Sequence, residues 1–163
     1  MTTGTGTRRL WHEDPHVWRV VLVRYLVVFA PLNLLWELAQ LPLYTLWTQA
    51  SPASIVYAVI HCTLGDMLIG VLALLVALLV TRAGPLERWR WGRVGAVAVG
   101  FGLAYTVFSE WFNTAVRMSW AYSEWMPLTP IIALGVSPLL QWLLLPTVAL
   151  AWARAAARKA NQI

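Results

Sequence analysis

The sequence has little charge and a single cysteine. Only 12% of its 163 residues are charged, whereas soluble domains carry roughly 25%. One cysteine, Cys62, cannot form an internal disulfide, which excludes a disulfide-stabilised scaffold. Hydrophobic residues make up 60% of the chain and its mean hydropathy is +0.64, which excludes a disordered chain. The composition therefore predicts an integral membrane protein.

The motifs of several common chemistries are also missing. The sequence contains no HExxH, Walker A, CxxC or glycine-flanked serine motif. These motifs would indicate metalloprotease, nucleotide-binding, thiol-redox and hydrolase chemistry respectively. We therefore assign no catalytic residue and no cofactor from the sequence.

Four apolar runs are long enough to cross a membrane, which takes about 20 residues in a helix. The predicted fold class is all-α, a polytopic membrane protein with four transmembrane helices in one bundle. We expect a disordered tail over 1–16 and a basic tail over 154–163. The membrane domain between them should span 17–153, with helices at about 20–44, 55–80, 94–116 and 131–152.

Basic residues predict the orientation of these helices. All but one of the 12 Lys and Arg residues lie in the N-terminal region, the loop between the second and third spans, or the C-terminal tail. The exception is Arg117, in the third loop. Because cytoplasmic loops are enriched in Lys and Arg, we expect both termini in the cytoplasm of a bacterial inner membrane. Topology thus accounts for the pI near 10.0, and we expect contact with membrane lipids and no nucleic-acid partner.

Polar residues inside the spans indicate a binding site, because an ionisable group costs about 2.5–3.5 kcal/mol at the centre of a spanning helix. They lie in the predicted outer half or near the midplane of each span, so we expect a shared cavity open to the outer side. We also expect at least one of its carboxyl groups to be protonated at neutral pH. The candidates for binding a ligand or proton are Glu37, Asp66, Glu110, His61, Asn113, Arg117, Gln141 and Asn33.

Helical spacing groups some of these residues and separates others. Asn33, Glu37 and Gln40 share one helix face, as do Glu110, Asn113 and Arg117. His61 lies about 140° around its helix from Asp66, so the two should not meet the same ligand atom. Carboxylates and imidazole are metal ligands, but the spacing of Glu37, His61, Asp66 and Glu110 is not diagnostic of a metal site.

Four strings between Trp36 and Pro146 carry a resemblance to other proteins: WELAQLPLY, HCTLGDMLIG, SEWFNTAVRMSWAYSEWMP and GVSPLLQWLLLP. They resemble segments of small, uncharacterised bacterial inner-membrane proteins with four spans. The resemblance implies the same fold and location, and it implies no activity.

Three functions therefore stay open. The favoured hypothesis is the binding or transport of a small or amphipathic ligand, with carboxyl groups that carry a proton or a cation. The second is an intramembrane enzyme that uses acid–base or metal chemistry on a lipid or isoprenoid. The third is an accessory subunit of a membrane complex. Small residues of the third span, such as Gly100, allow close helix packing, so a homodimer through this span is also possible.

Overall fold

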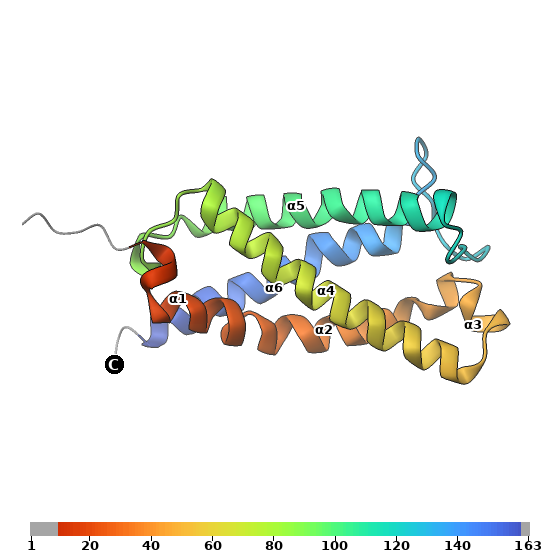
Figure 1. Cartoon of the computed structure of the whole chain (residues 1–163), viewed down its shortest axis with the longest axis horizontal. Helices are drawn as coiled ribbons and strands as arrows, with labels where there is room; N and C mark the ends of the chain where they lie inside the picture. The colour runs from red at the N-terminus through yellow and green to blue at the C-terminus, as the bar shows by residue number, and fades with distance from the viewer. Residues whose placement is uncertain (1–9, 161–163) are drawn as a thin grey trace, which may run out of the picture.

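The chain folds into four long antiparallel helices with short helical turns at their ends (Figure 1). The computed structural model describes residues 10–160, and within that range it has helices and no strand. In chain order the elements are η1 (Trp11–Glu13), α1 (Pro15–Arg19), η2 (Val20–Arg24), α2 (Leu26–Gln40), η3 (Leu41–Leu43), α3 (Leu46–Gln49), α4 (Pro52–Val80), η4 (Leu86–Arg88), α5 (Trp91–Trp111), η5 (Phe112–Val116) and α6 (Val136–Ala160).

Four of these segments are long and apolar enough to span a membrane. They cover Pro15–Leu43, Pro52–Val80, Trp91–Val116 and Val136–Lys159, which confirms the prediction of an all-α, multi-pass membrane protein. The helices α2, α4, α5 and α6 follow one another around the bundle, and α6 closes it against α2. Both described ends of the chain lie at the end of the bundle that also holds the α4–α5 loop (Figure 1).

The first and last helices differ from their predicted bounds. Residues 10–16, expected to be part of a disordered tail, contain η1 and the start of α1; residues 1–9 lie outside the described part. Asp14 begins α1 by accepting a hydrogen bond from the His16 N–H, and Pro15 occupies the first helical position. The other Asp14 oxygen accepts from the Leu86 N–H at 3.2 Å, which ties this end to the α4–α5 loop.

The fourth helix begins at Val136, later than the predicted residue 131. Leu128 and Gly135 form an antiparallel bridge, and Ala133 has a φ of 49°, so this stretch is a tight turn rather than helix. At the other end α6 continues through Ala160, over residues expected to form a basic tail. Alanines dominate this extension and are the strongest helix formers; residues 161–163 lie outside the described part.

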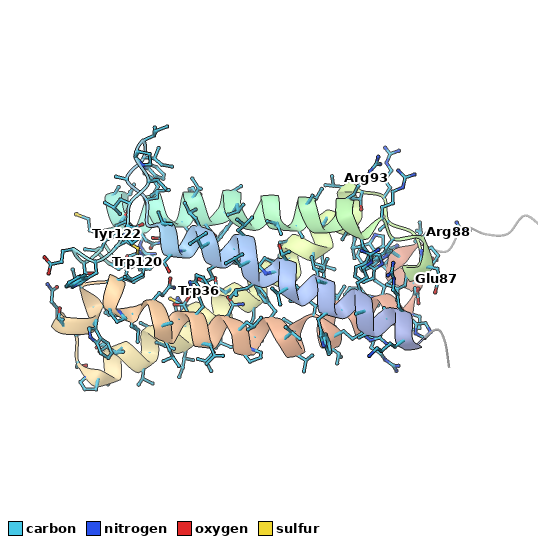
Figure 2. All side chains as sticks on the ribbon, turned by 180° about the vertical axis from the view of Figure 1, so that it is seen from behind. Trp36, Glu87, Arg88, Arg93, Trp120 and Tyr122 are labelled. Carbon is cyan, nitrogen blue, oxygen red and sulfur yellow. The ribbon has the colours of Figure 1, made fainter. Side chains whose placement is uncertain are left out.

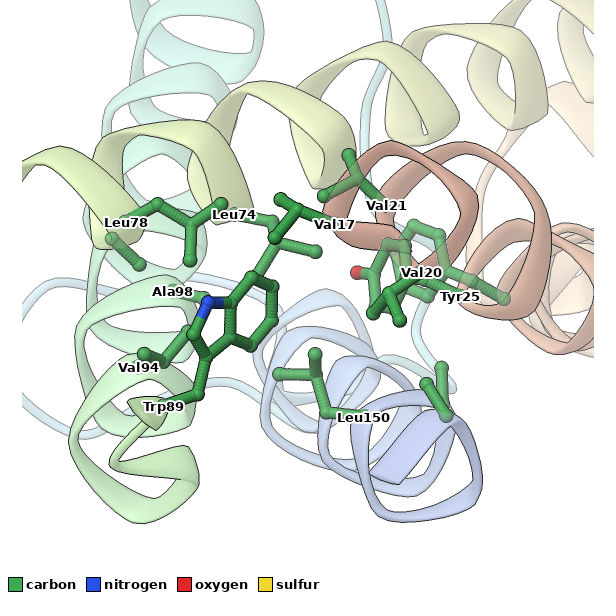
Figure 3. Close-up of a cluster of buried hydrophobic side chains, with 14 of the residues drawn as sticks. Val17, Val20, Val21, Tyr25, Leu74, Leu78, Trp89, Val94, Ala98 and Leu150 are labelled. Carbon is green, nitrogen blue, oxygen red and sulfur yellow. The ribbon is translucent and has the colours of Figure 1, made fainter. Parts of the chain in front are cut away.

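The two halves of the bundle have different interiors. Figure 2 shows the two ends, with Trp120 and Tyr122 at one and Arg88 and Arg93 at the other. The half near the termini has a dry apolar core in which Val17, Val20, Val21, Leu74 and Leu78 are fully buried (Figure 3). Trp89 from the α4–α5 loop inserts into this core, and its indole donates to the Gly84 carbonyl at 3.1 Å. In this half the helices therefore pack through apolar side chains, and the hydrogen bonds described above fix the α4–α5 loop.

Two glycines let aromatic rings pack against helix backbone. A Cβ at Gly70 would lie 2.5 Å from a carbon of Phe29, and a Cβ at Gly102 would lie 2.1 Å from a carbon of Trp142. Such distances are too short for carbon atoms, so only glycine fits. Gly100, in contrast, faces away from the core with nothing near it.

We predict that Gly102→Ala lowers the free energy of unfolding by about 1–3 kcal/mol, because Trp142 must move out of a packed position. Gly100→Ala is the matched control on the same helix and should not be destabilising. Unfolding in mixed detergent micelles, followed by circular dichroism, measures both. Equal stability of the two variants would contradict the packing of Trp142 on Gly102.

Candidate polar site

The side-chain amide of Gln141 lies at the centre of a polar cluster in the other half of the bundle. Its Nε2 atom is 3.0 Å from Asn33 Oδ1, 3.0 Å from Glu37 Oε1 and 2.8 Å from Asp66 Oδ2. One residue of α6 thus contacts two residues of α2 and one of α4. Gln141 is 2% exposed and Asn33 is fully buried, so no water replaces these bonds.

Glu37 and Asp66 lie next to each other. Both carboxyl groups accept from the same amide nitrogen, at 3.0 Å for Glu37 Oε1 and 2.8 Å for Asp66 Oδ2, so the two groups are close neighbours. Two carboxylates repel, so this contact is favourable when one proton lies between them. Within residues 10–160 no Lys, Arg or His side chain forms an ion pair with either group. The pair is therefore suited to holding a proton or receiving a cation.

Gln40, Ser137 and Trp36 extend the cluster toward the end of the bundle. Gln40 Nε2 donates to Glu37 Oε1 at 2.9 Å, and Gln40 Oε1 accepts from the Ser137 hydroxyl at 2.9 Å. The Trp36 indole in turn donates to Ser137 Oγ at 3.2 Å. The chain of bonds fixes the Glu37 side chain in one position.

Glu110 is bound separately, by the long loop between α5 and α6. The Tyr122 hydroxyl donates to Glu110 Oε2. The loop is held over the bundle by backbone bonds from the Thr45 N–H to the Ala121 carbonyl at 3.0 Å and from the Ser123 N–H to the Leu43 carbonyl at 2.9 Å. It places Trp120 near Glu110, with a buried indole N–H that has no hydrogen-bond partner among the described residues.

A cavity of about 560 Å³ connects these groups. Glu37, Asp66, Glu110 and Gln141 contribute to its polar wall, while Tyr44 and Trp120 line it from the loops. The α4 and α5 helices are close near the termini and diverge toward this end (Figure 1). Several lining residues on the two diverging segments are exposed, among them Tyr57, His61 and Tyr105. The cavity therefore opens sideways between α4 and α5.

The structure brings the predicted site residues together in two ways. Asn33, Glu37, Asp66 and Gln141 form the hydrogen-bonded cluster. The other four predicted residues line the cavity but form no hydrogen bond with the cluster: Glu110, His61, Asn113 and Arg117. His61 stacks on Tyr57 with ring centroids 5.5 Å apart, on the exposed side of α4.

The structure adds an aromatic part to the site. The candidates from the sequence include none of the four aromatic residues found there, which are Tyr44, Trp120, Tyr122 and Trp142. The structure turns Tyr122 onto Glu110 and places Tyr44, Trp120 and Trp142 in the cavity wall. The sequence holds a signal for one of these residues only: Trp142 is next to Gln141, a predicted site residue. The path of the loop carrying Trp120 and Tyr122 is not visible in a helical pattern.

The four possible metal ligands do not gather around one point. Among the described residues no three His, Cys, Asp or Glu side chains are arranged to hold a metal ion. Glu37 and Asp66 are adjacent, whereas Glu110 is bound to Tyr122 and His61 faces outward.

Comparisons of the chain with protein-family models, curated proteins and solved structures find no match. The resemblance to four-span bacterial proteins therefore stays a prediction, and any function must be argued from the site.

We predict that Gln141→Leu destabilises the protein by about 1–3 kcal/mol, because buried acceptors on two helices lose their shared donor. Gln49→Leu makes the same chemical change at an exposed position and should have little effect. Detergent unfolding of both variants is the measurement. A Gln141→Leu protein as stable as Gln49→Leu would show that the cluster does not hold the helices together.

A second prediction concerns the loop over the site. Tyr122→Phe removes the bond to Glu110 and should speed amide hydrogen exchange at residues 121–123 by about five- to tenfold, the effect of about 1 kcal/mol. Tyr105→Phe, which removes an exposed phenol, is the control. Unchanged exchange in Tyr122→Phe would mean that the backbone bonds alone hold the loop.

The same bond has a defined pH dependence. Burial and the Glu110 carboxyl raise the pKa of the Tyr122 phenol. A phenol with a raised pKa in the folded loop contributes its full stability below its ordinary pKa of about 10. This contribution is lost as the pH rises from there through the raised value. Exchange at residues 121–123 should therefore gain an extra acceleration only in alkaline solution, and Tyr122→Phe should abolish it.

Proposed function

We propose that this protein binds a small amphipathic ligand in the cavity between its helices and uses the carboxyl groups to hold a proton or a cation. One observation carries the proposal: a cavity of about 560 Å³ inside a membrane bundle is lined by Glu37, Asp66 and Glu110. That volume is typical of small-molecule sites. Ionisable side chains within a membrane span are costly and are usually retained for function.

The shape of the cavity favours an amphipathic ligand. The opening between α4 and α5 runs along the part of the bundle that lipid would surround. A ligand could leave its apolar part between Tyr57 and Tyr105 while its polar end reaches Asp66 and Gln141. Such a ligand would enter from the lipid phase rather than from water.

The chemistry of the wall favours a ligand with a positive charge or several hydrogen-bond donors. Each carboxyl group uses one oxygen in the hydrogen bonds described above, namely Glu37 Oε1, Asp66 Oδ2 and Glu110 Oε2. The remaining oxygens supply acceptors, and the aromatic rings of Trp120 and Trp142 suit a cation. A ligand ammonium group between Glu37 and Asp66 would offset their mutual repulsion, as a shared proton would.

The same proposal includes the orientation of the protein in a bacterial inner membrane. The end with the termini carries three arginines in the α4–α5 loop, one at the start of α5 and two on α6, namely Arg82, Arg88, Arg90, Arg93, Arg154 and Arg158. The opposite end carries Arg117. By the positive-inside rule the termini lie in the cytoplasm and the cavity faces outward.

Binding is supported more strongly than continuous transport. The apolar core near the termini is fully packed, so the cavity has no path through the cytoplasmic half. Transport would require the helices to rearrange. A homodimer that pairs through α5 is one arrangement in which two copies would form the pathway together. Ala96, Gly100 and Ala104 form an exposed small-residue stripe on that helix, of the kind that allows close helix pairing.

Filling the cavity tests the proposal. Gly65 lines it, and a Cβ there would meet nothing within 4 Å, so Gly65→Leu should occupy ligand space without disturbing the fold. Gly100→Leu is the control, at a position equally open but on the outer face. The protein is purified in lipid nanodiscs, and co-purifying small molecules are identified by mass spectrometry. We expect a molecule enriched with the wild type and Gly100→Leu and reduced about tenfold or more with Gly65→Leu.

The other functions give different results. A chemically altered lipid produced by the wild type, and lost in Asp66→Asn, would favour the enzyme. The same small-molecule profile in all variants, together with a stoichiometric protein partner, would favour the accessory subunit and contradict the binding proposal.

A further inference from the structure

The loop between α4 and α5 forms a second pocket, at the opposite end of the bundle from the cavity. Its volume is about 250 Å³, and four of its lining residues are arginines: Arg82, Arg88, Arg90 and Arg93. Figure 2 shows Arg88 and Arg93 projecting from this end. The positive-inside rule explains positive charge on this side of a membrane protein, but it does not require four arginines to line one pocket.

The loop is held rigidly beneath these arginines. Leu86 and Trp89 are buried in the apolar core. The Leu86 N–H donates to Asp14, and the Trp89 indole donates to the Gly84 carbonyl. The arginines therefore stand on an ordered base, and little conformational freedom remains to be lost by the backbone when a ligand binds.

Arg82 occupies a backbone position that usually belongs to glycine. Its φ is 49°, and its N–H bonds to the Leu79 carbonyl at 3.1 Å while the Ala83 N–H bonds to the Leu78 carbonyl at 2.9 Å. This is a Schellman motif, in which the left-handed residue after the helix is most often glycine. An arginine at this position has an unfavourable backbone conformation, and the residue lines the pocket.

The pocket has an excess of positive charge, although Glu87 lies in the same loop next to Arg88 (Figure 2). Among the described residues, no Asp or Glu lines it. Asp14, which contacts the same loop, uses its two oxygens to accept from the His16 and Leu86 N–H groups. The pocket also adjoins the beginning of α5. Arg90 precedes the first turn of this helix, and its side chain accepts no hydrogen bond from the backbone N–H groups of that turn. Free N–H groups at a helix start attract an anion.

We infer that this arginine pocket binds a phosphate group, supplied by the headgroup of an anionic lipid or by free phosphate. Guanidinium groups form paired hydrogen bonds with phosphate oxygens. Basic pockets between spanning helices at the membrane surface suit lipid headgroups. The inference concerns a different site from the cavity and does not depend on the proposed function.

The test measures lipid binding to the intact protein in detergent by native mass spectrometry. The probes are phosphatidylglycerol, zwitterionic phosphatidylcholine and inorganic phosphate. Arg88→Gln/Arg93→Gln removes two arginines from the pocket, and Arg154→Gln/Arg158→Gln removes two exposed arginines of α6 near the same end. Arg88→Lys/Arg93→Lys keeps the charge, and with it the membrane orientation, but loses the paired geometry.

We expect the wild type to bind phosphatidylglycerol about tenfold more tightly than phosphatidylcholine. Arg88→Gln/Arg93→Gln should lose most of that preference, the lysine variant part of it, and the α6 variant almost none. Displacement of the lipid by millimolar phosphate would identify free phosphate as a ligand, and persistence of the lipid would identify the headgroup. An equal loss in the loop and α6 variants, or no preference in the wild type, would overturn the inference.

Discussion

The contact between Gln141 and three acceptors on two other helices is the interaction on which the polar half of the bundle depends. In a membrane no water competes for these groups, so a buried amide must find its partners within the protein. The two N–H groups of Gln141 Nε2, shared among the three acceptors, hold α6 against α2 and α4. They also hold Glu37 and Asp66 together, an arrangement that mutual repulsion would otherwise oppose. The geometry of the site therefore follows from one side chain.

This arrangement is possible because apolar packing holds the helices together in the other half of the bundle. Close packing there, with Trp89 inserted between the helices, holds the chain together through dispersion forces. Gly70 and Gly102 extend that packing toward the middle by admitting the rings of Phe29 and Trp142. The helices can then diverge at the far end and leave a cavity, because the packed half already holds the same four helices together.

The sequence was informative where the spacing along one helix places polar residues on one face. Asn33, Glu37 and Gln40 were predicted on one face, and all three are buried. It also contained a signal that was overlooked: Asp14 followed by Pro15 is a typical helix start, yet that segment was expected to be disordered. The meeting of Gln141 with Asp66 could not be predicted, since helix order and rotation in a bundle are set by packing between helices. The contact of Tyr122 with Glu110 depends on the turns of a long loop.

That loop gives the site a property that the helices alone would not have. Glu110 lines the cavity and is also the acceptor that holds Tyr122. A ligand bound as proposed that takes the Glu110 oxygen used by Tyr122 would have to displace the phenol. On that proposal the coupling is reciprocal, so binding at Glu110 and the position of the loop would influence each other by the same free energy. The loop that covers the bundle is therefore part of the site, although none of its residues between Met118 and Gly135 lies on a spanning helix.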